Sequence, residues 1–141
     1  MTQRSVTARY PDILCFINGG SVHRAGKYWE QQAEAFLLKQ GLSLVARNFL
    51  TQLGEIDLIM RDESRLIFVE VRYRRRSRFT SAAGSVTQQK QKRLEKCAKL
   101  FRKQHQKWSD LPCRFDVIAY DEDSQVPDAI WLCAVFESTD W

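Results

Sequence analysis

Two acidic side chains are the residues of this sequence best placed to do chemistry. Asp57 follows Glu55 in one short apolar segment, and Glu70 lies in a second apolar segment that also contains Arg72. Acids inside apolar segments are uncommon, because a carboxylate taken out of water needs a hydrogen bond, an opposite charge or a cation. We therefore ask whether the chain brings these acids together.

The spacing of the two segments predicts how they face each other. Both are rich in Ile, Leu, Val and Phe, which is typical of strands, and a tight turn joins them as an antiparallel hairpin. The length of that turn sets the register and places Asp57 opposite Glu70, with their Cβ atoms about 5 Å apart. It also places Glu55 opposite Arg72. The predicted strands are residues 54–60 and 65–73, and the turn is residues 62–65.

Two carboxylates this close repel each other unless something neutralises them. A divalent cation does so directly, since Mg²⁺ prefers hard oxygen ligands from one or two carboxylates together with water and phosphate. We expect Asp57 and Glu70 to bind Mg²⁺, or Mn²⁺ in its place. The alternative left open is a structural ion network with Arg72 or Lys90. We expect Glu55 to pair with Arg72 across the strands rather than to contact the metal ligands from outside the site.

Two helices and five strands are predicted to position these residues. Apolar residues recur at helical spacing around Trp29 and Phe36 up to Gly41, and Thr87 is a suitable N-cap for the second helix. The order αβββαββ predicts an α/β sandwich. We expect an irregular or flexible arm over residues 1–25 and a single domain over residues 26–141. The helices are predicted at residues 27–40 and 87–107, and the remaining strands at residues 42–50, 113–120 and 129–135.

Basic residues are concentrated in the middle of the chain. Residues 71–108 contain thirteen Lys or Arg and a single acid, Glu95, and they include a predicted mobile loop at residues 74–86. A block of this density indicates nucleic acid as the partner. An anionic membrane surface is a weaker candidate, and a solvated surface is the alternative. The side chains expected to bind phosphates are Arg74, Arg75, Arg76, Arg78, Lys92, Arg93 and Lys96.

The composition excludes several other classes of protein. The chain has 141 residues, of which 44% are hydrophobic, so general disorder is excluded and one folded core is expected. The four cysteines are too far apart for a structural zinc site, and buried free thiols are preferred to disulfides. No apolar run is long enough for a membrane span or a signal peptide, so we expect a cytoplasmic protein without membrane attachment.

Several segments together resemble a known family. The segments are Gly26-Lys27-Tyr28-Trp29-Glu30, Gly54-Glu55-Ile56-Asp57-Leu58-Ile59, Phe68-Val69-Glu70-Val71-Arg72-Tyr73-Arg74, Ser85-Val86-Thr87 with Lys90, and Arg114-Phe115-Asp116-Val117. In this order and spacing, from about Gly26 to the C-terminus, the chain resembles the YraN-like family of uncharacterised bacterial proteins. That family is similar to archaeal Holliday-junction resolvases and to the wider PD-(D/E)XK, or restriction-endonuclease-like, superfamily.

The resemblance implies a fold, an activity and a set of site residues. The fold is a restriction-endonuclease-like αβββαβ core with a mixed central sheet flanked by helices, often in a homodimer. The activity is Mg²⁺-dependent endonuclease hydrolysis of phosphodiester bonds in branched or structured DNA, in DNA repair or recombination. By position, Glu30 is the helix carboxylate that binds the metal directly or through water, and Asp57 and Glu70 are the metal-binding pair. Arg72 takes the place of the motif lysine.

Arg72 departs from the superfamily pattern Glu-x-Lys. A lysine can lose its proton on burial and so position or deprotonate the attacking water, whereas a guanidinium remains protonated and only binds charge. We expect Lys90 to supply an ammonium in its place. The departure also supports a second hypothesis, a nucleic-acid-binding module with a nuclease-like fold and little or no catalysis. A third, a protein-interaction role, predicts no DNA binding even at low salt.

Five further side chains have simpler expected roles. Asp116 is expected to form a hydrogen bond or an ion pair. Trp29 and Trp108 are expected to pack in the core rather than stack on bases. Tyr73 and Phe79, beside the arginines, are better candidates for stacking on bases.

Overall fold

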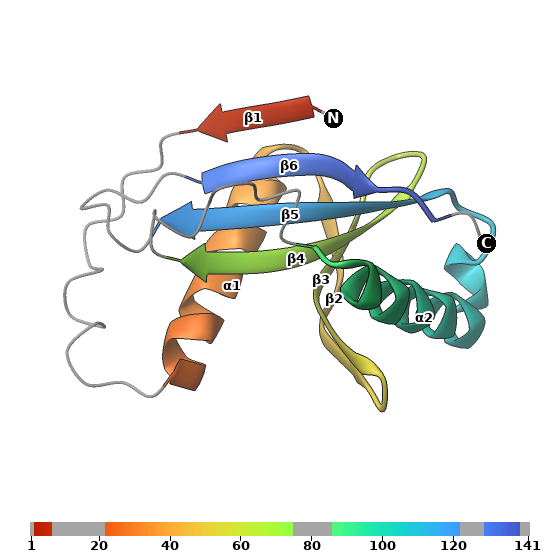
Figure 1. Ribbon diagram of the computed structural model, residues 1–141. Coiled ribbons are helices and arrows are strands. Elements are labelled where there is room, and N and C mark those ends of the chain that lie inside the picture. Colours follow the sequence, from red (N-terminus) through yellow and green to blue (C-terminus); the bar gives the residue numbers. More distant parts are fainter. Residues whose placement is uncertain (1, 7–21, 75–85, 122–128, 139–141) are drawn as a thin grey trace.

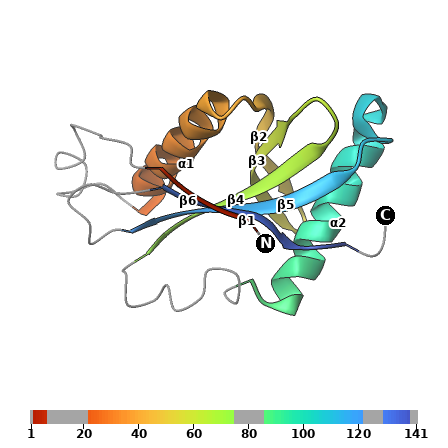
Figure 2. The same ribbon diagram turned by 90° about the horizontal axis from the view of Figure 1, so that it is seen from above.

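Six strands form one mixed sheet, and a helix packs on each of its faces (Figure 1; Figure 2). The computed structural model describes residues 2–6, 22–74, 86–121 and 129–138. The strand order is β1-β6-β5-β4-β3-β2, in which β4 and β5 run parallel and all other neighbours are antiparallel. The elements are β1 (Thr2–Val6), α1 (Val22–Lys39), β2 (Ser43–Thr51), β3 (Gly54–Arg61), β4 (Leu66–Arg74), α2 (Gln88–Gln104), the short 3₁₀ helix η3 (Gln106–Trp108), β5 (Cys113–Asp121) and β6 (Ala129–Phe136).

The architecture is the α/β fold predicted from the sequence. The helix α1, the antiparallel strands β2, β3 and β4, the crossover helix α2 and the strand β5 form the restriction-endonuclease-like αβββαβ core. The crossover through α2 explains why β4 and β5 are parallel, because two parallel neighbours cannot be joined by a tight turn. Helices therefore flank a mixed central sheet, and β6 and β1 extend it beyond β5.

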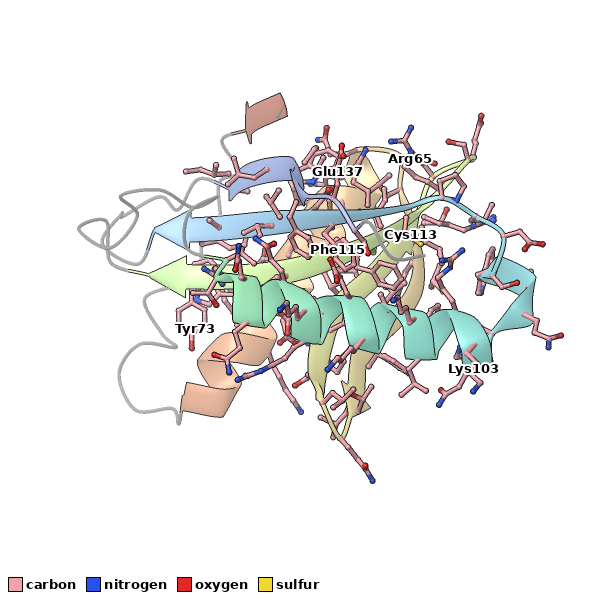
Figure 3. The ribbon with its side chains drawn as sticks, turned by 45° about the vertical axis from the view of Figure 1, so that its right-hand side comes forward. Arg65, Tyr73, Lys103, Cys113, Phe115 and Glu137 are labelled. Atoms are coloured by element: carbon pink, nitrogen blue, oxygen red, sulfur yellow. The ribbon has the colours of Figure 1, made fainter. Side chains whose placement is uncertain are left out.

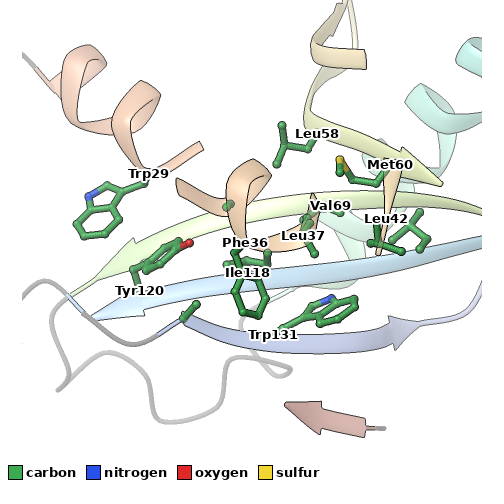
Figure 4. Close-up of a cluster of buried hydrophobic side chains, with 13 residues drawn as sticks. Trp29, Phe36, Leu37, Leu42, Leu58, Met60, Val69, Ile118, Tyr120 and Trp131 are labelled. Carbon is green, nitrogen blue, oxygen red and sulfur yellow. The ribbon is translucent and has the colours of Figure 1, made fainter. Parts of the chain in front are cut away.

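The helix α1 covers one face of the sheet through its apolar stripe. Trp29, Phe36 and Leu37 are buried there against the central strands, together with the side chains shown in Figure 4. The helix begins one turn earlier than predicted, at Val22. Residues 1–25 show no sustained apolar period, so the sequence pattern did not reveal this first part of the helix.

The helix α2 covers the opposite face. The Thr87 hydroxyl accepts a hydrogen bond from the Lys90 main-chain N–H at 3.2 Å, which confirms the predicted N-cap. Cys97 and Phe101 are among its buried residues, and its outer surface is charged or polar. The helix ends at Gln104, three residues before the predicted end, because the chain leaves helical geometry at the following residue, and Trp108 belongs to η3.

The hairpin between β3 and β4 has the predicted turn. Asp62 closes it, since its carboxylate accepts hydrogen bonds from the main-chain N–H groups of Ser64 and Arg65, each at 2.8 Å. Arg61 pairs with Leu66, as predicted. The predicted register of the two strands is therefore confirmed at the turn. Whether Asp57 and Glu70 pair depends on how far this register continues along β3 and β4.

The N-terminal segment differs from its prediction. Thr2–Val6 form β1, which pairs antiparallel with β6. The prediction of an irregular arm is therefore wrong for these residues and for the first turn of α1. An edge strand is held by main-chain hydrogen bonds and needs no strong apolar alternation, which is why the sequence did not reveal it. Most of the predicted loop at residues 74–86 and of the arm lies outside the described residues. No helix in the described ranges is long and apolar enough to cross a membrane.

Candidate functional site

The side chains of β3 change sides of the sheet at Asp57. Leu58 and Met60 pack in the core beneath α1, whereas Ile56 packs with Ile59 in the core beneath α2. A regular strand would place Ile56 and Leu58 on the same face, since side chains alternate with a period of two. The regular alternation of β3 is therefore broken, and the irregularity lies at Asp57.

The ladder between β3 and β4 ends at the same place. The predicted register holds from Arg61–Leu66 as far as Leu58–Val69, one pair short of Asp57. There the Asp57 carboxylate itself takes part in the sheet, because its Oδ2 accepts a hydrogen bond from the Val71 N–H at 2.9 Å. Asp57 thus lies against the main chain of β4 immediately after Glu70, at the point where the two strands separate.

Glu70 projects from β4 toward α2. Its Oε1 atom contacts the Lys90 ammonium from the first turn of α2 and lies 3.4 Å from Nε of Arg72. Its Oε2 atom is buried and has no hydrogen-bond partner among the described residues. The side chain is 12% exposed and borders a small cavity whose walls include Ile56 and Phe68. One oxygen of Glu70 is therefore neutralised by cations, and the other is left without a partner.

Asp57 is the centre of a group of carboxylates. The pKa of Asp57 is raised to about 7, mainly by burial and also by the charges of three nearby acids, while the hydrogen bond from Val71 lowers it. The three acids are Glu70, Glu30 and Glu55. An acid that holds its proton up to neutral pH lies where the protein supplies too little positive charge. The structure thus brings Glu30 from α1, Asp57 and Glu70 into one electrostatic neighbourhood.

Asn48 of β2 is a site residue that the sequence analysis missed. Its Nδ2 donates hydrogen bonds to Glu30 Oε2 at 2.8 Å and to Glu55 Oε1 at 2.9 Å. Its backbone is left-handed, with φ of 47°. Asparagine is depleted in strands but tolerates this conformation, so an Asn inside an otherwise apolar strand pattern was the signal that could have identified it.

The predicted pair between Glu55 and Arg72 does not form. The Glu55 carboxylate binds Asn48, and Arg72 is 7% exposed and contacts Glu70. The register that would have paired Glu55 with Arg72 ends before it reaches them, because β3 leaves β4 at Asp57. Glu55 therefore lies on the α1 side of the site with Glu30, and Arg72 lies on the α2 side.

The carboxylates are suitable ligands for a hard divalent cation, but the protein offers only a few of them. Among the residues that the structure describes, no group of three or more His, Cys, Asp or Glu side chains is arranged to hold a metal ion by itself. Asp57 and the partnerless oxygen of Glu70 are two hard donors, and Mg²⁺ commonly takes only one or two carboxylates and completes its shell with water and phosphate. The donor set thus fits the ion expected from the sequence.

The basic residues are divided between described and undescribed parts of the chain. Lys92, Arg93 and Lys96 are exposed on α2, whose C-terminal turn carries Lys103 (Figure 3). A hollow on the surface of that helix is lined by three lysines, two acids and two glutamines: Lys92, Lys96, Lys99, Glu95, Glu137, Gln88 and Gln91. Arg74 is the last residue of β4. The other predicted phosphate ligands, Arg75, Arg76 and Arg78, and the stacking candidate Phe79 lie outside the described residues.

Three other predicted roles can be compared with the structure. Asp116 is buried and accepts hydrogen bonds from Arg114, from the Trp131 indole and from the Ala134 N–H, so its structural role is confirmed. Trp29 packs in the core as predicted. Tyr73 stacks on Trp29 with ring centroids 6.3 Å apart and is only partly exposed, so it is less available to bases than expected.

The candidate site lies in the part of the chain that matches a known protein family. The model of the uncharacterised protein family UPF0102 matches residues 29–120, a range that includes Glu30, Asp57, Glu70 and Lys90. This chain belongs to the UPF0102 family. The resemblance to the YraN-like family is thereby confirmed.

Curated UPF0102 proteins from several bacteria are similar to this chain over most of its length. A relative from Pseudomonas fluorescens is 41% identical over 120 residues, which cover 84% of this chain and 98% of the relative. A relative from Klebsiella pneumoniae is 46% identical over 114 residues, which cover 80% of this chain and 86% of the relative. One from Psychrobacter arcticus is 52% identical over 103 residues, or 70% of this chain, and the match spans 60% of that longer protein.

Proposed function

We propose that this UPF0102 protein is a Mg²⁺-dependent endonuclease that hydrolyses phosphodiester bonds in branched or structured DNA. The observation that carries the proposal is the closeness of two carboxylates: Asp57 lies against the Val71 N–H, and the buried Oε2 of Glu70 has no hydrogen-bond partner in the described part of the chain. Two hard oxygen donors from neighbouring strands are the kind of protein ligand set that Mg²⁺ uses when water and a phosphate complete its coordination shell.

The chemistry divides between a bound cation and the side chains around it. When bound, Mg²⁺ or Mn²⁺ supplies a Lewis acid for the phosphate and lowers the pKa of water. Asp57 and Glu70 would hold the cation, and Glu30 of α1 would bind it directly or through water. Arg72, always protonated, binds the scissile phosphate and stabilises the charge that develops on it.

Lys90 supplies the ammonium that the motif position lacks. Its Nζ contacts Glu70 Oε1, so an ammonium lies beside the metal-binding carboxylate although it comes from α2 rather than from β4. In that place it would orient the attacking water and stabilise negative charge that develops beside it. Arg72 in the motif position is therefore compatible with catalysis, provided that Lys90 remains beside Glu70.

The basic surface of α2 holds the nucleic-acid backbone. Lys92, Lys96 and Lys99 border one hollow on the helix whose first turn carries Lys90, so phosphates bound along the helix lead toward the carboxylates. Contacts of this kind position the substrate without reading its sequence. DNA is accordingly proposed as the partner on charge rather than on base recognition.

A second candidate function is a nucleic-acid-binding module without catalysis. Glu70 Oε1 has cationic neighbours in both Lys90 and Arg72, as in the structural ion network that the sequence left open. If that network is the only role of Glu70, the protein binds DNA through α2 and does not cleave it.

A cleavage assay distinguishes the two. The wild-type protein, Asp57→Asn and Glu70→Gln are incubated with a four-way junction, a flap and a linear duplex in Mg²⁺, Mn²⁺ or EDTA. The nuclease predicts cleavage by the wild type only, lost in EDTA, with DNA affinity retained by both variants. Binding of DNA by all three proteins, with no cleavage in either metal, contradicts the nuclease and supports the binding module.

A further inference from the structure

The geometry of Asn48 extends the candidate site to the strand β2. One amide nitrogen donates to two carboxylates from different elements, Glu30 of α1 and Glu55 of β3, at 2.8 and 2.9 Å. Both carboxylates are among the charges that act on Asp57. Each keeps a second oxygen outside this pair of hydrogen bonds. The amide therefore holds two acids beside Asp57 without neutralising either of them.

The backbone of Asn48 indicates a constrained position. Its φ of 47° is left-handed, although it lies inside a strand whose pairing with β3 continues on both sides, at Arg47–Leu58 and Phe49–Ile56. For most residues this conformation costs about 1–2 kcal/mol, and asparagine is one of the few that adopt it readily. The residue between those two pairs on β3 is Asp57, so the two irregular positions face each other across the strands.

We propose that Asn48 is a positioning residue for the metal site: its amide orients Glu30 and Glu55 toward Asp57 and so sets the affinity for the divalent cation. This inference rests on the proposed function. Asn48 does not bind the cation, and it acts only through the two carboxylates. Partners that orient metal ligands in this way typically change metal affinity about 10- to 100-fold when they are removed.

The variant Asn48→Gly distinguishes the effect of the side-chain amide from the effect of the left-handed backbone. Asn48→Gly keeps the left-handed conformation accessible and removes only the side chain, whereas Asn48→Ala would add backbone strain. The matched control is Arg47→Ala, because Arg47 also joins β2 to α1. It donates two hydrogen bonds of 2.6 Å to Glu34, which is not one of the acids that act on Asp57. Both variants lose a tether between strand and helix, and only one touches the site.

Titration calorimetry with Mn²⁺ alone, together with thermal unfolding without metal, tests the inference. We expect Asn48→Gly to weaken Mn²⁺ binding about 10-fold or more, and Arg47→Ala to bind as the wild type does. In a background of Glu30→Gln and Glu55→Gln, Asn48→Gly should have no further effect, because the groups through which it acts are changed. Equal Mn²⁺ affinity of Asn48→Gly and the wild type, whether or not the melting temperature falls, overturns the inference alone. Absence of Mn²⁺ binding in the wild type overturns the metal site of the proposed function as well.

Discussion

The Oδ2 atom of Asp57 accepts a hydrogen bond from the main-chain N–H of Val71 at 2.9 Å, so a side chain of β3 takes part in the ladder where its strand leaves β4. This contact places the Asp57 carboxylate against the residue that follows Glu70. It also explains how one acid can be buried at the separation of two strands: a main-chain donor stabilises its charged form, while burial and three nearby acids oppose it.

The stability of the protein should depend on the charge of Asp57. Because burial raises the pKa of Asp57 from 3.8 to about 7, the folded state without metal favours the neutral acid. The wild type therefore loses stability as the pH rises from about 4 to about 7. Asp57→Asn, which retains an acceptor for Val71, should be the more stable protein above pH 7, by up to about 4 kcal/mol, and equal to the wild type near pH 3.5.

Urea unfolding in EDTA across this pH range measures the effect. A constant difference between the two proteins at all pH values would contradict the raised pKa. Glu63→Gln, on the exposed turn between β3 and β4, serves as the control for loss of a carboxylate.

Lys90 and Arg72 should be coupled in catalysis. If Lys90 supplies the ammonium beside Glu70, Lys90→Ala should lower kcat by about 100-fold with little change in DNA affinity. Adding Arg72→Lys should restore part of that loss, because the ammonium then comes from the motif position on β4. Single-turnover cleavage in Mg²⁺ measures both variants, and equal rates for Lys90→Ala and the wild type would exclude this role.

Asp116 should be important for stability and not for the chemistry. Its buried carboxylate joins Arg114 on its own strand to the Trp131 indole and the Ala134 N–H of β6. Asp116→Ala leaves these donors without their acceptor, so the free energy of unfolding should fall by about 3–5 kcal/mol. Denaturant unfolding tests this, with exposed Asp110→Ala as the control. A loss below about 1 kcal/mol would show that the network contributes little.

The lysines of α2 should determine the salt dependence of DNA binding. Lys92, Lys96 and Lys99 border one hollow on the exposed side of the helix. Each Lys→Ala change that removes a phosphate contact should lower the slope of log K against log salt concentration by about 1. Lys39→Ala, at the end of α1, is the control. Unchanged slopes in the α2 variants would place the binding surface elsewhere on the protein.

Much of the fold was predictable because local patterns and packing agree. The apolar stripe around Trp29, the N-cap Thr87 and the turn closed by Asp62 each specify their element through neighbours close in sequence. The register of β3 and β4 followed from the length of that turn. These features led to the carboxylates Asp57 and Glu70 before any contact between distant residues was known.

The remaining features depend on departures from regular structure. A period of two cannot show that β3 changes sides at Asp57, nor that the register stops at Leu58, and the expected pair of Glu55 with Arg72 failed for that reason. The role of Asn48 depends on a left-handed backbone inside a strand. The strand β1 depends on pairing with the distant strand β6. Each is a tertiary effect that local sequence does not encode.

Titration calorimetry with Mg²⁺ and Mn²⁺ is the most direct test of the metal site. The wild type should bind one divalent ion, release protons from Asp57 on binding at pH 7, and gain thermal stability with rising metal concentration. Glu70→Gln, which removes the charge from the carboxylate with the partnerless oxygen, should abolish binding, while the control Asp110→Ala should bind normally. Binding of equal strength in the wild type and Glu70→Gln, or no binding in either, would contradict a metal site between β3 and β4.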